Sequence, residues 1–487
     1  MKTCDVLLRR ATVFDGSGSD RFQADVALSQ GRIEAVGQLQ TMTAAQTIDL
    51  NGLALAPGFI DVHTHDDRLL LADPAMTPKL SQGVTSVVVG NCGISLAPLG
   101  RHEAVPPLNL VAEDAEQGPA QRFDSFASYF AQLEASPAAV NMAALIGHTT
   151  LRVVALEDWS RAANALEISQ MQELVREGLR AGALGVSTGT YYAPAAAATA
   201  SEIRAVCEPL RGSNALIASH LRDEGDQVLQ AMSETISIAS DLGVRQVLSH
   251  HKVLGRANFG RSRETLALLA QAKNKSDICL DCYPYTASST VLRADAAAQA
   301  SRTLVAWSKT LPEASGRYLD ELASEHQLSE QEMIAALQPA GAIYFSMDEA
   351  DVERILAYPE TMIGSDGLPH DTFPHPRLWG TFPRVLGHYA RERRLFSLEQ
   401  AIHKMTGLPA SRFRMPGRGR VQAGYAADLV VFDPQRVADQ ATFAAPLQPA
   451  VGIERVYVNG HLAWLAGQAT AARAGQVIRR AEMEAQA

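Results

Sequence analysis

The stretch GFIDVHTHDD, residues 58–67, joins an apolar run to two histidines and two aspartates. On a β-strand the side chains of residues i and i+2 point to the same side, so His63 and His65 can reach one common point. Two converging neutral imidazoles form part of a binding site for a divalent metal ion. A solvated turn or a buried core histidine would leave the same local pattern, so this stretch alone keeps those alternatives open.

Short apolar runs that end on polar residues recur along the chain, and about eight can be counted. They are FIDVHTH (59–65), SVVVGNC (86–92), AALIGHT (143–149), LGVSTG (184–189), ALIASH (215–220), VLSHH (247–251), ICLDCY (278–283) and MIGSDG (362–367). Segments of helical period separate them, such as EISQMQELVREGLRAG, residues 167–182. Buried parallel strands joined by helices predict an α/β fold, a TIM-like (β/α)8 barrel whose site lies at the C-terminal strand ends. An open doubly wound sheet is disfavoured because no GxGxxG turn follows the first run.

Both ends of the chain lack this alternation of apolar runs with helical segments. They contain short strand-like stretches separated by turns. DVLLRRATVFDG, residues 5–16, and IERVYVNGHLAW, residues 453–464, are bounded by Gly, Asp and Asn. We therefore predict a small β-sandwich domain built from residues 1–57 and 415–487, and a catalytic barrel over residues 58–414. Residues 287–343 interrupt the rhythm between the last two runs, which indicates an inserted lobe near the active site.

Composition narrows the class of protein. The 487 residues are 47% apolar and 20% charged with a net charge of -10, which is typical of a soluble globular protein and not of one that binds nucleic acid. The five cysteines are an odd number scattered through a long chain, which favours a reducing compartment. No apolar run reaches membrane-spanning length and the first residues lack the apolar core of a signal peptide. We expect a cytoplasmic monomer that acts on a small molecule, without a membrane or nucleic-acid partner.

Other predicted strand ends strengthen the metal interpretation. Residues with zinc-binding side chains fall there, namely Cys92, His148, His220, His250, His251 and Asp366. Cysteine, histidine and carboxylate are the ligands that zinc prefers in proteins. A zinc site at the mouth of the barrel is the leading hypothesis.

Several motifs together resemble one family. APGFIDVHTHDD (56–67), GNCGIS (90–95), GALGVSTGTYYAP (182–194), SHLRDEG (219–225), LSHHKVLG (248–255) and MIGSDGLPHD (362–371) are similar to motifs of the N-acyl-D-amino-acid deacylases, or D-aminoacylases, of the metal-dependent amidohydrolase superfamily. The resemblance covers about residues 5–460 and implies a distorted (β/α)8 barrel with a small β domain.

The resemblance also implies a ligand set. One tightly bound zinc ion would be held by Cys92, His220 and His250. A second, weaker metal position would use His63 and His65 together with Cys92 and Asp366. Amidohydrolases often bridge two metals with a carboxylated lysine, but this chain has no lysine between Lys79 and Lys252, so the thiolate of Cys92 is the available bridging ligand.

The same resemblance implies catalytic and substrate-binding roles. Asp366 would be the general base and acid, and no GxSxG elbow indicates a nucleophilic serine. Substrate-binding residues are expected to be Lys252, Tyr283 and Arg377 for the α-carboxylate, Tyr191, Tyr344 and Met347 for the side chain, and Ser289. Relatives that prefer acidic side chains place a cation after the SST motif, where this chain has Arg293 among small residues. The remaining histidines near the strand ends, His148, His251, His370 and His375, are expected to be structural or to orient ligands.

Three functions remain open from the sequence. The first is zinc-dependent hydrolysis of the linear amide bond of N-acyl-D-amino acids, with hydrophobic or broad side-chain preference and N-acyl-D-glutamate or N-acyl-D-aspartate as the alternative substrates. The second is cyclic-amide hydrolysis of the dihydropyrimidinase type, which the missing lysine disfavours. The third is an inactive barrel that serves as a scaffold, which the intact ligand set disfavours.

Overall fold

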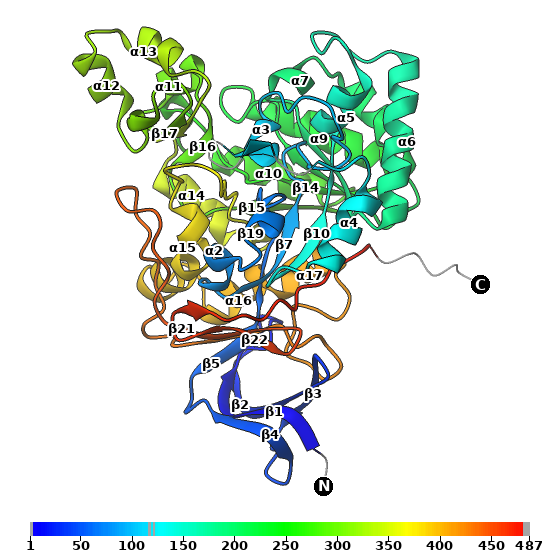
Figure 1. Ribbon diagram of the computed structural model, residues 1–487, viewed down its shortest axis with the longest axis vertical. Helices are drawn as coiled ribbons and strands as arrows, with labels where there is room; N and C mark the ends of the chain where they lie inside the picture. The colour runs from blue at the N-terminus through cyan, green and yellow to red at the C-terminus, as the bar shows by residue number, and fades with distance from the viewer. Residues whose placement is uncertain (1–2, 115–117, 120–121, 481–487) are drawn as a thin grey trace.

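A ring of parallel strands forms the centre of the protein in the computed structural model, which describes residues 3–114, 118–119 and 122–480 (Figure 1). The ring contains β6 (Phe59–Asp61), β7 (Val84–Val89), β10 (Asn141–Ala144) with β11 (Ile146–Gly147), β12 (Gly185–Gly189), β13 (Leu216–His220), β14 (Arg245–Leu248), β15 (Ile278–Cys282) and β19 (Thr361–Ile363). Their order in the ring follows their order in the chain, and each neighbouring pair is parallel. All eight predicted runs are therefore barrel strands, and the predicted α/β barrel is confirmed.

The ring closes where the residues after β6 meet the residues after β19. Thr64 and Gly367 form a parallel bridge there. The Asp366 amide donates to the His63 carbonyl at 2.7 Å, and the His65 amide donates to the Gly367 carbonyl at 3.1 Å. We call this pairing of residues 61–66 with residues 363–367 the barrel seam, and it joins two of the predicted functional segments.

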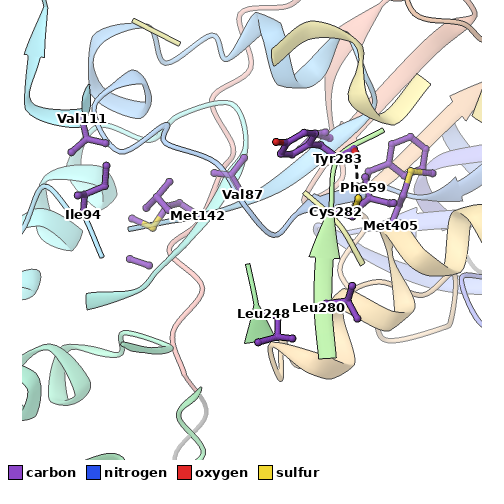
Figure 2. Packing of buried hydrophobic residues seen from close by; sticks show 14 of the residues in the cluster. Phe59, Val87, Ile94, Val111, Met142, Leu248, Leu280, Cys282, Tyr283 and Met405 are labelled. Atoms are coloured by element: carbon purple, nitrogen blue, oxygen red, sulfur yellow. Dashed lines mark hydrogen bonds between the residues drawn. The ribbon is translucent and has the colours of Figure 1, made fainter. Parts of the chain in front are cut away.

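Alternate strand residues fill the barrel and contact the surrounding helices. The interior cluster contains Ile60, Val62, Val88, Ala143, Leu145, Leu184, Leu216, Ala218, Val247, Cys279 and Met362. Residues of the opposite parity, such as Phe59, Val87 and Leu280, belong to a larger cluster with helix residues, including Met405 (Figure 2). Ile478, near the C-terminal end, belongs to the interior cluster and brings the end of the chain to the barrel.

Helices surround the barrel. The principal ones are α4 (Phe126–Ala135), α5 (His148–Ala155), α6 (Ala165–Ala181), α8 (Ala200–Val206), α9 (Val228–Leu242), α10 (Ser262–Ala272), α14 (Glu349–Ala357), α15 (Arg377–Arg384), α16 (Leu398–Met405) and α17 (Gly407–Arg412). Helix α6 begins with a capping box between Asn164 and Glu167 and ends at Gly182, whose φ of 108° suits glycine. None of the described helices is long and apolar enough to cross a membrane.

Both chain ends contribute to one nine-stranded sheet, which forms the predicted small β domain at the bottom of Figure 1. Its strands are β1 (Thr3–Val13), β2 (Phe22–Ser29), β3 (Arg32–Gly37), β4 (Thr43–Asp49), β5 (Ala54–Pro57), β20 (Leu429–Phe432), β21 (Ile453–Val458), β22 (His461–Leu465) and β23 (Gln468–Ala469). The antiparallel pair of β5 and β20 joins the two halves. The domain limits at residues 57/58 and 414/415 stay a prediction, and residues 1–2 and 481–487 lie outside the described part.

The inserted lobe is a separate small unit beside the barrel mouth, in the upper left of Figure 1. It contains the antiparallel strands β16 (Ser288–Val291), β17 (Thr303–Ser308) and β18 (Ala340–Tyr344), with helices α11 (Ala294–Gln299), α12 (Leu319–Glu325) and α13 (Glu330–Leu337). A core of its own, including Val305, Leu322 and Met333, holds these elements together. Residues of β16, α11 and β18 line the cavity described next, so the lobe contributes one of its walls.

Candidate metal centre and active site

The predicted site residues meet at the C-terminal ends of the barrel strands. Cys92, His250 and Asp366 follow β7, β14 and β19, and all three have a left-handed backbone, with φ of 53°, 34° and 50°. A non-glycine residue in this region is strained, and such residues are concentrated at functional sites. The strain is consistent with backbones that turn these side chains toward one point above the barrel.

Cys92 lies at the centre of the cluster. Its Sγ atom is 3.2 Å from Nε2 of His63 and 3.2 Å from Nε2 of His250. Nε2 of His250 is in turn 2.9 Å from Nδ1 of His220. The structure thus brings together all three residues predicted for the tight zinc position, and it places His63 against the same sulfur atom.

The residues predicted for the second metal position surround Asp366. Oδ1 of this carboxylate is 3.3 Å from Nε2 of His65 and 3.5 Å from Nε2 of His63. Burial alone would lower the pKa of His65, but Asp366 and Cys92 outweigh it and raise the pKa to about 9. In this structure, four residues, His63, Cys92, His250 and Asp366, each offer a ligand atom within 4.8 Å of the others.

The donor set fits zinc. Burial alone would raise the pKa of the Cys92 thiol, but His63, His250 and His220 outweigh it and hold the pKa well below its usual range. The lowered pKa favours the thiolate, which is the form that binds metal ions. A buried thiolate surrounded by imidazole nitrogens matches the nitrogen and sulfur ligands of protein zinc sites.

Two buried carboxylates that support the ligands were missing from the sequence prediction. Glu224 has Oε1 3.2 Å from Nδ1 of His250, and it forms a second group with His220 and His250 that could hold a metal ion. Asp281 has Oδ1 3.3 Å from Nδ1 of His63 and accepts a hydrogen bond from the His250 amide at 2.8 Å. Ligating histidines need such partners to fix the ring orientation.

The sequence carried a signal for both carboxylates. Glu224 stands four residues after His220 within the quoted SHLRDEG motif. Asp281 is two residues beyond Cys279, which faces the barrel interior, so strand parity predicts an inward carboxylate.

Asp366 is held ionised by its surroundings. Burial alone would raise its pKa, but Arg377, whose Nη1 is 2.9 Å from Oδ2, and the neighbouring histidines outweigh burial and hold the pKa well below its usual range. Arg377 also lies over the ring of Tyr283, at 4.5 Å from the centroid. The arginine thus occupies a fixed place between the carboxylate and an aromatic face.

A cavity of about 130 Å³ opens beside this cluster. Four of the predicted substrate-binding residues line it, namely Lys252, Tyr191, Ser289 and Tyr344. Three others are buried and are not among its lining residues, namely Tyr283, Arg377 and Met347. His65, Cys92, His220, His250 and Asp366 also line the cavity, so it gives direct access to the ligand cluster.

Lys252 lines the cavity and also contacts two buried side chains. Its ammonium group is 2.7 Å from Oε1 of Glu224 and 2.7 Å from Nδ1 of His250. Burial would lower the pKa of Lys252, but Glu224 outweighs it and raises the pKa above its usual value. Lys252 is therefore a cation that lines the cavity and contacts His250.

The histidines expected to be structural have partners of their own. His251 contacts the Thr265 hydroxyl at 2.8 Å, and Nε2 of His148 is 3.6 Å from Glu202. His375 lies 3.0 Å from the Ala287 carbonyl and accepts a hydrogen bond from the Arg377 amide at 3.0 Å, so it positions that arginine. His370 lies in the loop after β19.

Fold and site together define a metal-dependent hydrolase barrel, and comparison with known proteins agrees. The chain matches the amidohydrolase family over residues 46–463. It is 53% identical to a D-aminoacylase of Alcaligenes xylosoxydans xylosoxydans over 98% of both chains. It is 52% identical to an N-acyl-D-aspartate deacylase of the same organism, covering 97% of this chain and 95% of that one.

A solved structure is also similar along the whole chain. It is the N-acyl-D-glutamate deacylase from Bordetella bronchiseptica, complexed with zinc and a phosphonate inhibitor, with 43% identity and a TM-score of 0.93. The match covers 98% of this chain and 100% of that one. The chain belongs to the N-acyl-D-amino-acid deacylase, or D-aminoacylase, family of amidohydrolases.

Proposed function

We propose that the protein is a zinc-dependent hydrolase that cleaves the linear amide bond of N-acyl-D-amino acids into a carboxylate and a free D-amino acid. The observation that carries the proposal is the Sγ atom of Cys92 between two imidazoles at the wall of the cavity. The activities of these relatives support the substrate class. We place the zinc on Cys92, His220 and His250, with His63 and His65 at a second, weaker position.

Zinc bound there would lower the pKa of a bound water molecule and polarise the substrate carbonyl. Asp366 is ionised before the reaction, because Arg377 lies against its Oδ2 atom. It therefore accepts the proton of the attacking water molecule and donates it to the departing amide nitrogen, which would otherwise leave as an unstable anion. Glu224 and Asp281 hold the ring nitrogens of His250 and His63 on the side away from the cluster.

The α-carboxylate of the substrate would be met by Lys252 at the cavity wall, with the buried Arg377 and Tyr283 outside the lining. Lys252 supplies a point charge at the wall, whereas Arg377 pairs with Asp366 and would add positive charge from outside the lining. Tyr191 and Tyr344 line the part of the cavity that would receive the side chain.

The charge balance of that part of the cavity favours uncharged side chains. Arg293 lies over the Tyr191 ring, with its guanidinium carbon 4.6 Å from the centroid. Asp295, which lines the cavity, binds the same guanidinium group through contacts of 2.9 and 2.6 Å. Asp295 thus neutralises the positive charge of Arg293. We therefore propose that the enzyme prefers substrates with hydrophobic side chains, or accepts a broad range, and does not prefer acidic side chains.

Asp295→Ala is expected to raise kcat/KM for N-acetyl-D-glutamate about tenfold, since one charge-assisted hydrogen bond from a released Arg293 contributes about 1.5 kcal/mol. Turnover of N-acetyl-D-methionine should stay within about threefold of the parent. The matched control is Asp320→Ala, which removes a partner of Arg302 at 3.2 Å elsewhere in the lobe. A rise with both substrates, or with the control, would contradict the proposed masking of Arg293.

The experiment that tests the function is a turnover assay of the zinc-loaded protein with N-acetyl-D-methionine, N-acetyl-D-glutamate and their L enantiomers. We expect hydrolysis of the D-methionine compound and at least a hundredfold slower hydrolysis of its L enantiomer, on the order of 3 kcal/mol in transition-state binding. Cleavage of the D-glutamate compound alone would replace the hydrophobic preference with an acidic one. If zinc is bound and none is cleaved, the deacylase proposal fails, and cyclic amides or a scaffold role become the alternatives. We further propose a cytoplasmic monomer with the domain limits given above.

A further inference from the structure

A fully buried lysine lies beneath the metal-ligand cluster and takes no part in the mechanism above. Lys79 is on the short helix α2 (Thr77–Leu80), between β6 and β7, and its side chain is 0% exposed. Removing an ammonium group from water costs several kcal/mol unless it is paired and hydrogen-bonded. The surroundings of Lys79 therefore need to compensate for its charge.

Its partners all belong to the barrel seam. Nζ is 2.7 Å from Oδ2 of Asp61 and 2.9 Å from the Thr64 hydroxyl. It is also 3.0 Å from the Ser365 hydroxyl and 3.2 Å from Oδ2 of Asp66. One cation thus contacts residues on both sides of the seam.

Asp61 reinforces the same junction. Its Oδ1 accepts a hydrogen bond from the Ser365 amide at 2.8 Å, and its Oδ2 accepts one from the Ser365 hydroxyl at 2.6 Å. The contacts of Lys79 alternate in sequence with the functional residues, because Thr64 stands between His63 and His65 and Ser365 precedes Asp366. A change in the position of Thr64 or Ser365 would move those neighbours directly.

The strand pairing at the seam is short. β6 and β19 have three residues each, and beyond them a single parallel bridge joins the described strands across the seam. The side chains around Lys79 therefore supply much of the connection that a longer ladder gives other strand pairs. A displacement of about 1 Å between catalytic groups can lower a rate by about a hundredfold.

We propose that Lys79 is a positioning residue that fixes His63 and His65 relative to Asp366 by clamping both sides of the barrel seam. This proposal rests on the proposed function for its kinetic readout. Lys79 is absent from the cavity wall and does not contact the reacting atoms. Cys92, His220 and His250 lie outside the seam, so their zinc position should not depend on Lys79.

The test compares Lys79→Met with a matched buried lysine, Lys404→Met. Lys404 is 5% exposed and contacts the Tyr358 and Thr361 carbonyls at the opposite, N-terminal end of β19. Lys79→Met should lower kcat by about 10- to 100-fold, the usual effect of losing a group that orients ligands. KM should change less than about threefold, because the cavity wall is intact. Lys404→Met should lower the melting temperature and leave kcat unchanged.

Zinc titration supplies a readout that does not depend on turnover. In Lys79→Met the tighter zinc equivalent should bind as in the parent, while the weaker one should lose about 10- to 100-fold in affinity. The double variant Lys79→Met/Asp66→Asn removes one charge of each sign, and it should show the same changes if Lys79→Met alone folds poorly. Unchanged kcat and zinc affinities in a folded variant, or equal losses in Lys404→Met, would overturn the proposal. If the parent cleaves no N-acyl-D-amino acid, the proposed function fails, whereas the zinc titration still decides the role of Lys79.

Discussion

Asp366→Ala is expected to lower kcat by about 10²- to 10⁴-fold, which is the range for losing a general acid and base. The carboxylate is the one group in the described cluster that contacts His63, His65 and Arg377 together and also lines the cavity. Steady-state kinetics with N-acetyl-D-methionine measures the loss. Zinc bound by Cys92, His220 and His250 should remain, since Asp366 is outside that set.

The control for this variant is Asp351→Ala. Asp351 is also buried and also pairs with an arginine, Arg354, at 2.8 Å, but it lies on α14 outside the barrel. The control should lose stability and keep kcat. A loss of less than about tenfold in Asp366→Ala would transfer the proton-transfer role to another group.

Cys92→Ser is expected to remove the tightly bound zinc and to lower kcat/KM on the order of 10³-fold, because a bound metal contributes several kcal/mol to such a transition state. Serine is nearly the same size as cysteine, and both are non-glycine residues in a left-handed backbone with φ of 53°, so the comparison isolates the sulfur atom. Its hydroxyl is a poor zinc ligand at neutral pH, whereas the neighbouring histidines lower the pKa of the Cys92 thiol and so favour the thiolate that binds zinc. Metal analysis after dialysis, together with the turnover assay, measures both effects.

The matched control is Cys207→Ser. Cys207 is equally buried, but it follows α8, and burial raises its pKa to about 12, so it stays a neutral thiol. This variant should retain its zinc and its activity. Retention of one zinc per chain in Cys92→Ser would show that His63, His220 and His250 suffice, and that the sulfur is not a ligand.

Much of the fold could be predicted from the sequence, because buried parallel strands appear in it as short, continuous apolar runs. Each barrel strand is a short apolar run with a polar residue at its end, and strand parity places His63 and His65 on one side. The convergence of Cys92, His220 and His250 followed from the family resemblance and from the rule that barrel sites lie at C-terminal strand ends.

The supporting carboxylates were harder to find for a physical reason. Asp281 and Glu224 act on rings that are distant in sequence, and no periodicity in one chain shows which ring a carboxylate meets. The same is true of Lys79, whose partners include Ser365, 286 residues later in the sequence. The spacing of residues predicts which face of a strand a side chain occupies. Which residues distant in the sequence it contacts depends on how the barrel closes.

The joining of both chain ends in one sheet has a consequence for synthesis on the ribosome. β5 is made early and β20 late, yet they are direct neighbours, and Ile478 joins the barrel interior only after all the barrel strands have been made. Contacts between such distant segments carry a high entropic cost of closure and make folding slow. During translation of the whole barrel, the edge of β5 that pairs with β20 therefore remains unpaired. This edge is the place where chaperone binding or misassembly of nascent chains should concentrate.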